Sequence, residues 1–461
     1  MADAAPVYWS IRQLTESYRA GVLTPSEVVE DVLQRIARVD DELHAYVTVT
    51  ADLAREQAAE ATAAYRRGES GPLLGVPVSV KDVFHVRGVP TSLGSLVHEG
   101  QVAKADSGVV QRLRAAGAVF TGKTHTAEFG QSATTENLLG PDTGNPWDAG
   151  RTPGGSSGGA AASVAAGMAS VAVGSDGGGS VRIPAAFCGL VGLKATVDRC
   201  LDERGFREMS DFVGPGPLAW RVCDARRVFG VLSGGDTGGV GRGEVGASGV
   251  KVAWAPRPEG RPVESGVSER VASVAGALRS RGHEVGERDL PLSGWNEIFA
   301  PLVLEEEHRE RGHLLSDPDR LTRYQRASLR GARDLDVGVV EAARGALREY
   351  RARIAALFDE VDVLLMPTTA TAAFPLGQRP RSVDGESVGS LWGAFPFAVP
   401  FNVAGTPAIT VPCGVVGGLP VGAQLVAASG REGLLLDLAE QVEAACGFDV
   451  SPVVRRWSGG G

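Results

Sequence analysis

Cysteine is scarce in this chain of 461 residues, and its pattern excludes two common roles. The five cysteines are Cys188, Cys200, Cys223, Cys413 and Cys446. They are odd in number, lie far apart and form no C-x-x-C pair. This pattern indicates neither a disulfide framework nor a zinc site, and no other His, Cys and Asp spacing predicts a metal site. Such cysteine usage favours a reducing compartment.

Long hydrophobic runs are also missing. The longest run of small apolar residues, 160–174, is interrupted by Ser163, Gly167 and Ser170, and it is too short to span a bilayer. The first residues, MADAAPVYWSIRQL, contain no basic region followed by an apolar core, so no signal peptide is predicted. We therefore expect a soluble cytoplasmic protein without a membrane partner.

An excess of positive charge is absent as well. The chain has 46 Lys and Arg against 55 Asp and Glu, which gives a formal net charge of −9, and it contains no lysine-rich stripe. Because nucleic acids bind to basic surfaces, we expect no nucleic-acid partner. Glycine, by contrast, is abundant at 62 residues. Its lack of a collagen-like period is typical of tight turns and close backbone approaches.

Helix and strand patterns mix along the whole chain. The sequence Thr-Pro-Ser-Glu at 24–27 predicts a capped helix start, and the alternation in 76–81 predicts a half-buried strand that ends at Lys81. Further strands are predicted at 250–256, 361–367 and 407–414, and further helices at 51–67, 107–116 and 264–282. This mixture predicts a layered α/β protein. The glycine-rich residues 233–249 predict a flexible loop.

Residues 117–124, GAVFTGKT, match the G-x-x-x-x-G-K-[ST] pattern of a phosphate-binding loop. A true loop of this kind follows a strand, precedes a helix and is flexible between its glycines. Here a predicted helix precedes Gly117, and the bulky Ala-Val-Phe-Thr between the glycines favours a strand. We interpret the segment as a helix end followed by a buried strand.

Residues 154–158, GGSSG, match the G-x-S-x-G turn that carries the serine of α/β-hydrolases. That chemistry needs a histidine as base, and the downstream candidates are His283, His308 and His313. None lies in a glycine-rich or strand-end setting. The last two fall in EEEHRERGH, which is typical of a solvated helix face. A histidine-based triad is therefore not predicted.

The sequence also contains several longer motifs in a fixed order. They are GVPVSVKD, which contains Lys81, RTPGGSSGG at 151–159, GSDGGGSVRIPAAFCGLVGLK at 174–194, and DVLLMPTT and FNVAGTPAITVPCG further on. Together they resemble the amidase signature family of serine hydrolases, over most of the chain. The resemblance implies an α/β fold with a large mixed, twisted sheet covered by helices on both faces. It also implies a single domain over 1–461. We divide it into an N-terminal helical segment at 7–67, a signature core at 70–232, a loop at 233–249 and a substrate-determining half at 250–455.

The resemblance implies a catalytic set of two serines and one lysine. Lys81 matches the family's strand-end lysine, Ser156 the bridging serine in cis conformation, and Ser180 the nucleophile. The backbone N–H groups of the oxyanion hole, which would stabilise a tetrahedral intermediate, are those of Gly177, Gly178, Gly179 and Ser180. Neighbouring residues expected to support these groups are Ser157, which we also expect to cap the following helix, and Asp176 and Arg182, for which a purely structural ion pair is the alternative. No cofactor or metal is implied.

Physical chemistry fits these roles. A serine hydroxyl is a weak nucleophile and needs a base within hydrogen-bond reach. Lysine can be that base only when its amine is neutral, which requires burial to lower its pKa. Small residues before Ser180 would let consecutive N–H groups approach an oxyanion. The resemblance thus implies hydrolysis of a carbon–nitrogen amide bond through an acyl-enzyme.

The expected substrate is a small apolar or aromatic carboxamide. Aromatic residues in the second half that could line an acyl pocket are Trp295, Phe299, Phe374, Trp392, Phe395 and Phe397. Nearer to the catalytic motifs, we expect Thr126, Ala127 and Phe129 to contact the acyl group. The oligomeric state stays open, with a homodimer among the alternatives.

Other functions remain open at this point. The first is the glutaminase component of a tRNA-dependent amidotransferase, although A-T-V-D-R-C after Lys194 departs from the usual Pro-Thr-Tyr-Gly type of continuation. His125 also stands where the family commonly has Asn. A second alternative is an acyl-transferring enzyme in which an amine replaces water. A third is a non-catalytic binding protein on the same scaffold.

Overall fold

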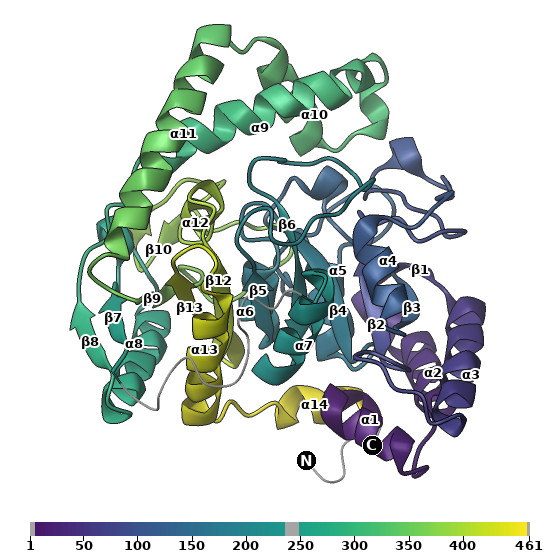
Figure 1. The fold of residues 1–461 in the computed structure, drawn as a ribbon. Helices are drawn as coiled ribbons and strands as arrows, with labels where there is room; N and C mark the ends of the chain where they lie inside the picture. The colour runs from purple at the N-terminus through teal and green to yellow at the C-terminus, as the bar shows by residue number, and fades with distance from the viewer. Residues whose placement is uncertain (1–4, 236–248, 459–461) are drawn as a thin grey trace.

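One large β-sheet organises the part of the chain that the computed structural model describes, residues 5–235 and 249–458 (Figure 1). Its strands are β1 (Tyr46–Val49), β2 (Pro77–Lys81), β3 (Val119–Thr124), β4 (Val171–Asp176), β5 (Val191–Lys194), β6 (Gly214–Ala219), β7 (Lys251–Trp254), β8 (Glu284–Glu287), β9 (Val363–Pro367), β12 (Ala408–Val416) and β13 (Leu419–Ala427). They form one mixed sheet in the order β1-β3-β2-β4-β6-β5-β12-β13-β9-β7-β8. A small separate hairpin pairs β10 (Ser382–Val383) with β11 (Glu386–Ser387).

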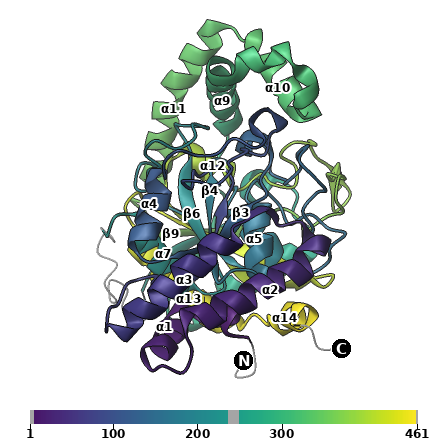
Figure 2. The same cartoon turned by 90° about the vertical axis from the view of Figure 1, so that its right-hand side faces the viewer.

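Helices cover both faces of the large sheet (Figure 2). They are α1 (Ile11–Arg19), α2 (Pro25–Leu43), α3 (Ala51–Arg66), α4 (Gly108–Ala115), α5 (Gly158–Ala165), α6 (Arg182–Cys188), α7 (Val222–Leu232), α8 (Ser265–Ser280), α9 (Trp295–Arg311), α10 (Arg323–Arg333), α11 (Val337–Leu357), α12 (Val399–Val403), α13 (Glu432–Cys446) and α14 (Ser451–Trp457). Helices α4, α7, α13 and α8 contact one another in a row on one face, while α5 and α6 pack together on the other. The predicted α/β architecture is confirmed.

Helices α9, α10 and α11 form an additional layer beyond the sheet. In both views this layer lies at the end of the molecule opposite to α1 and α14 (Figures 1 and 2). Helix α9 contacts both α10 and α11, and it also reaches the short helix α12. The layer supplies one wall of the cavity described below.

Local sequence signals explain several element boundaries. Helix α2 begins after Thr24, whose hydroxyl accepts from the N–H of Glu27, and the Glu27 carboxylate accepts from the N–H of Thr24 in return. The strand predicted at 76–81 is β2, but all five of its residues are buried. The half-buried expectation was wrong because helices cover both sides of the sheet.

Residues 117–124 form no phosphate loop. Helix α4 ends before Gly117, which has a φ of +84°, and strand β3 follows directly. Strand β3 pairs with β1 and with β2, so its backbone groups are used in the sheet. Lys123 is buried and pairs with Asp82 at 2.7 Å. The interpretation as a helix end and a buried strand is confirmed.

No helix within 5–235 and 249–458 is long and apolar enough to cross a membrane. The loop predicted at 233–249 falls mostly outside the described residues. The proposed division of the chain into segments stays a prediction.

Candidate active site

Lys81 lies at the end of β2, inside the protein. Ser79, two residues earlier on the same face, contacts the hydroxyl of Ser163 in α5 at 2.8 Å, so this face of β2 looks toward α5. The amine of Lys81 therefore points to the same side. Its Nζ contacts Oγ of Ser156, just before α5, and Oγ of Ser175 at the end of β4, each at 2.7 Å. Because β2 and β4 are parallel neighbours, their carboxyl ends meet at one edge.

Burial changes the acid–base behaviour of Lys81. The side chain is fully buried, and burial lowers its pKa to about 8, while the carboxylates of Glu208 and Asp176 oppose this decrease. A lysine with a pKa near 8 is neutral in a useful fraction of molecules at mildly alkaline pH. It can therefore accept a proton.

Ser156 is held against Lys81 by the segment that precedes α5. The Gly155–Ser156 peptide bond is cis, and the side chain of Ser156 is completely buried. The hydroxyl of Thr135 donates to the carbonyl of Gly154 at 2.8 Å, which fixes the segment from the other side. Any side chain at Gly155 would collide with the backbone of Thr134, so the close packing depends on glycine there.

Ser157 precedes α5 as expected, but its side chain does not cap the helix. Its hydroxyl donates to the carbonyl of Ser175 at 3.2 Å. The hydroxyl of Thr135 accepts from the N–H of Gly158 at 3.0 Å and thus serves the start of the helix instead. Through this hydrogen bond, Ser157 connects the segment before α5, which carries Ser156, to the end of β4, which carries Ser175.

Ser180 follows the three glycines in the turn between β4 and α6. Gly179 has a φ of +107°, and a Cβ there would lie 2.6 Å from Cβ of Ala398, so glycine is required. The N–H of Gly179 donates to Oδ1 of Asp176 at 2.8 Å. Among the described residues, the N–H groups of Gly177, Gly178 and Ser180 have no acceptor. They are the groups of this turn that a ligand oxygen can still use.

Asp176 and Arg182 form a fully buried ion pair under this turn. Nε and Nη2 of Arg182 donate to the two carboxylate oxygens, each at 2.9 Å, and Asn402 donates to Oδ1 at 2.9 Å. Burial alone would raise the pKa of Asp176, but Arg182 holds that pKa well below its usual range. Arg182 also donates to Gln424 on β13, so the ion pair fixes the turn to the centre of the sheet.

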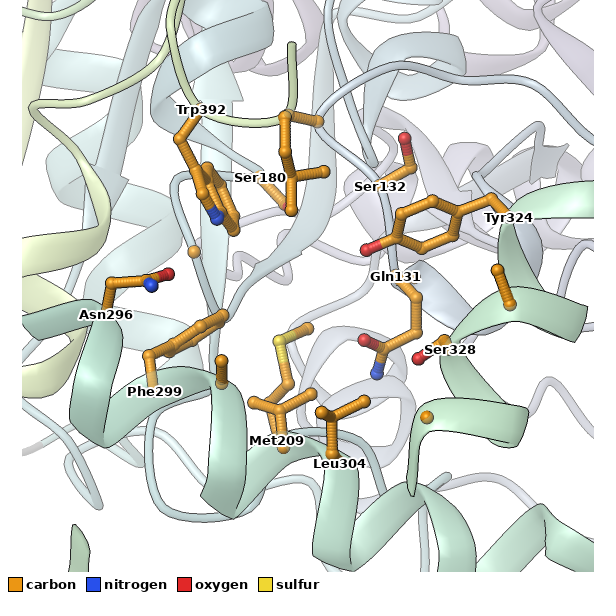
Figure 3. A pocket seen from close by; sticks show the side chains of 18 residues that line it. Gln131, Ser132, Ser180, Met209, Asn296, Phe299, Leu304, Tyr324, Ser328 and Trp392 are labelled. Carbon is orange, nitrogen blue, oxygen red and sulfur yellow. The ribbon is translucent and has the colours of Figure 1, made fainter. Parts of the chain in front are cut away.

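A cavity of about 310 Å³ opens at Ser180 and extends toward α9 and α10 (Figure 3). Its lining residues are Gly130, Gln131, Ser132, Ala133, Gly178, Ser180, Met209, Asn296, Phe299, Ala300, Val303, Leu304, Tyr324, Ala327, Ser328, Gly331, Leu391 and Trp392. None of them is charged. Figure 3 shows Phe299, Met209 and Leu304 along one side and Gln131, Ser132 and Tyr324 on another, with Ser180 and Trp392 at the top. The cavity is apolar with a polar margin.

The residues predicted to contact substrate separate into two groups. Trp392 lines the cavity, as does Phe299. Thr126, Ala127, Phe129 and Phe395 are buried but do not belong to the lining. The ring of Phe395 packs against two other phenylalanines, Phe187 and Phe374, with centroids 6.0 Å and 5.8 Å away.

Two further predictions of this region can be compared with the structure. His125 is buried, with Nδ1 located 3.0 Å from the amide nitrogen of Asn137, and burial lowers its pKa to about 4. Most of the charged stretch EEEHRERGH lies in α9, which ends at Arg311, while Gly312 and His313 begin a short 3-10 helix; the stretch is not wholly solvated. Glu307 is buried, accepts from Arg311, and accepts from Gln131 at 3.1 Å. This contact supports the wall of the cavity.

Sequence reasoning missed two residues beside Lys81. Ser175 contacts the amine of Lys81 and donates to Oε1 of Glu208 at 2.7 Å. Ser175 stands at the end of a strand next to β2, and that position was a usable signal. Glu208 lies in the irregular segment between β5 and β6, where no pattern indicates its burial.

Known proteins resemble this chain over nearly its whole length. The family model described as Amidase matches residues 27–436. AmiB2 of Mycobacterium tuberculosis, named as an amidase, is 38% identical, and the match covers 92% of this chain and 93% of that protein. One component of the glutamyl-tRNA(Gln) amidotransferase of Carboxydothermus hydrogenoformans is 34% identical, over 95% of this chain and 97% of that protein. A bacterial aryl acylamidase of known structure superimposes with a TM-score of 0.88 at 25% identity, over 98% of this chain and 99% of that one.

A mixed sheet with helices on both faces, and a buried lysine in contact with two serine hydroxyls, are the features of a layered α/β enzyme of the hydrolase class. The chain belongs to the amidase signature family, whose members are amide-hydrolysing enzymes. The alternative of a non-catalytic binding protein is not supported.

Proposed function

We propose that the enzyme hydrolyses a small, uncharged amide with an apolar or aromatic acyl group, with Ser180 as nucleophile and Lys81 and Ser156 as the proton path. The observation that carries this proposal is the 2.7 Å contact between the fully buried amine of Lys81 and the hydroxyl of Ser156. Ser180 lies on the adjoining turn and lines the cavity.

The first step forms the bond between Oγ of Ser180 and the carbonyl carbon of the amide. The proton of Ser180 moves to Ser156 as Ser156 passes its own proton to neutral Lys81. The hydroxyls of Ser156 and Ser180 make no hydrogen bond within the described residues, and we expect them to approach when substrate binds, because catalytic hydrogen bonds tighten in the substrate complex.

The second step breaks the carbon–nitrogen bond. Lys81 returns its proton through Ser156 to the leaving nitrogen, which departs as ammonia or an amine. Water then attacks the acyl-enzyme, Ser156 and Lys81 take its proton, and the acid leaves as Ser180 regains a hydrogen. An amine in place of this water would give acyl transfer.

The oxyanion of each tetrahedral intermediate would bind to the free N–H groups of the glycine turn. Gly178 and Ser180 both line the cavity, and neither N–H has an acceptor in the described residues. Gly179 donates to Asp176 and so holds the turn in shape. One well-placed donor of this kind contributes about 3–4 kcal/mol to transition-state stabilisation.

The cavity supports an apolar acyl group over a zwitterion. Phe299, Val303 and Trp392 offer hydrophobic surface, and its volume of about 310 Å³ suits a substrate of about one aromatic ring. Free glutamine carries an ammonium and a carboxylate, and no charged side chain lines the cavity to pair with them. For this reason we favour an amidase over the glutaminase function of the amidotransferase component.

A panel of amides tests the proposal. Benzamide, acetamide and glutamine would be compared by ammonia release, and benzanilide by aniline release, with Ser180→Ala as the blank. We expect benzamide to exceed glutamine in kcat/KM by at least about a hundredfold, because an unpaired buried charge costs several kcal/mol. Preferred turnover of glutamine would contradict the proposed substrate class. Formation of a hydroxamic acid when hydroxylamine is added would identify acyl transfer.

A further inference from the structure

A buried carboxylate lies one hydroxyl away from Lys81. Glu208 is 3% exposed, and its Oε1 accepts from the hydroxyl of Ser175 at 2.7 Å. Its Oε2 has no hydrogen-bond partner among the described residues. Oε2 lies where a Cβ at Gly130, a residue of the cavity wall, would stand. A group buried without full hydrogen bonding is costly, which calls for an explanation.

The hydroxyl of Ser175 joins this carboxylate to the amine of Lys81. Ser175 has one proton, and an ionised carboxylate can only accept, so with Glu208 ionised the proton of Ser175 points to its Oε1, 2.7 Å away. The oxygen of Ser175 is then left to accept from Lys81, whose Nζ is 2.7 Å away. One N–H of Lys81 is thereby directed toward Ser175.

The direction of that N–H decides where the lone pair of Lys81 can point. A neutral amine has two N–H bonds and one lone pair, and Lys81 contacts two hydroxyls. If Ser175 receives an N–H, the lone pair is free to accept the proton of Ser156. If the proton of Ser175 pointed to Lys81 instead, it would occupy the lone pair and block the base.

We propose that Glu208 is a positioning residue, which acts through Ser175 to direct the lone pair of Lys81 toward Ser156. This inference rests on the proposed function of Lys81 as the base. Glu208, Ser175, Lys81 and Ser156 then form one continuous row of hydrogen bonds with a fixed proton direction, which ends at Ser156, the serine that takes the proton of the nucleophile Ser180.

The charges around this line give Glu208 a second effect that can be measured. Lys81 interacts with Glu208 and with Asp176, and Asp176 is neutralised by Arg182 whatever happens at Glu208. Glu208 itself faces Lys81, Arg311 and Glu307; burial raises its pKa, and Lys81 and Arg311 oppose the rise. Loss of the Glu208 carboxylate therefore removes the main interaction that keeps Lys81 protonated. The pKa of Lys81 should decrease below its present value.

The experiment compares Glu208→Gln with Glu306→Gln. Glu306 is a matched control, since it is also a buried glutamate that accepts from a serine hydroxyl, that of Ser210 at 2.7 Å. The readout is the second-order rate constant of labelling by a fluorophosphonate between pH 5 and pH 10. In the wild type we expect this rate constant to rise with pH and then to reach a plateau. In Glu208→Gln the rising part, which we call the acid limb, should shift to lower pH by about one unit, and the rate constant at the plateau should decrease at least about tenfold. Glu306→Gln should follow the wild-type profile.

An acid limb of folded Glu208→Gln that coincides with that of the wild type would overturn the inference, because a merely structural role does not move a titration. If Glu208→Gln does not fold, Ser175→Ala removes the hydroxyl that connects Glu208 to Lys81. This variant should lower the labelling rate constant at the plateau at least about tenfold. An unchanged plateau in Ser175→Ala would overturn the inference as well. Absence of labelling at Ser180 in the wild type would instead refute the proposed function, so the two failures are distinguishable.

Discussion

The buried amine of Lys81 makes the pH dependence of catalysis a specific prediction. Only the neutral amine can accept the proton of Ser156, so the active form is the deprotonated one. Burial lowers the pKa of Lys81 to about 8. We therefore expect kcat/KM to rise with pH, to bend near pH 8 and to reach a plateau above it.

The size of the effect follows from the same pKa of about 8. Below that value the neutral fraction decreases tenfold for each pH unit. At pH 7 kcat/KM should be about one tenth of the plateau, and at pH 6 about one hundredth. An exposed lysine would keep its usual pKa of about 10.4, and the tenfold and hundredfold losses would then occur near about pH 9.4 and about pH 8.4.

The assay is the initial rate of ammonia release from benzamide at concentrations below KM, between pH 5 and pH 10. A neutral substrate ensures that the profile reports the free enzyme. Two other buried bases in this part of the described chain are His125 and Lys194; burial lowers the pKa of His125 to about 4 and that of Lys194 to about 7. If kcat/KM is constant from pH 6 to pH 9 and decreases only near pH 4, Lys81 is not the base. Such a profile would refute the reasoning and would indicate His125 as the base.

Three further substitutions test separate parts of the site. Ser156→Ala should lower kcat/KM by about 10²–10⁴-fold with an unchanged circular dichroism spectrum, since it removes the proton path alone; near-normal turnover would contradict that role. Arg182→Leu should lower the free energy of unfolding by about 3–5 kcal/mol in urea denaturation, because it leaves the buried carboxylate of Asp176 unpaired; an unchanged unfolding midpoint would count against this view. Trp392→Ala should raise KM for benzamide about tenfold, because it removes an aromatic contact worth about 1.5 kcal/mol. The KM for acetamide, which has no ring, should stay nearly unchanged. Equal effects on both amides would place Trp392 outside the acyl site.

Much of the fold could be predicted because its signals are local. The capping box at Thr24, the existence of strand β2 and that of strand β3 are each indicated by a few neighbouring residues, although the burial of both faces of β2 is not. The approach of Lys81 to Ser156 could be anticipated only from the order of the motifs. Periodicity alone does not bring residues 75 positions apart to within 2.7 Å.

The wall of the cavity could not be predicted in the same way. Phe395 and Trp392 are both large aromatic residues and nearly adjacent, yet one packs on Phe187 and the other lines the cavity. Trp392 packs against Trp295 and Phe299 of α9, with ring centroids 5.7 Å and 5.9 Å away. Glu208 was missed for a related reason, since its partner Ser175 lies 33 residues earlier and its own segment has no regular structure.

The identity of the nucleophile is the central claim, and covalent labelling tests it most directly. The wild-type enzyme would be treated with a fluorophosphonate at pH 9 and digested, and the modified peptide identified by mass spectrometry. The proposed mechanism predicts one modification, on Ser180, which is absent in Ser180→Ala and much slower in Lys81→Ala. Modification of Ser156 in its place, or undiminished labelling of Ser180→Ala, would contradict the account.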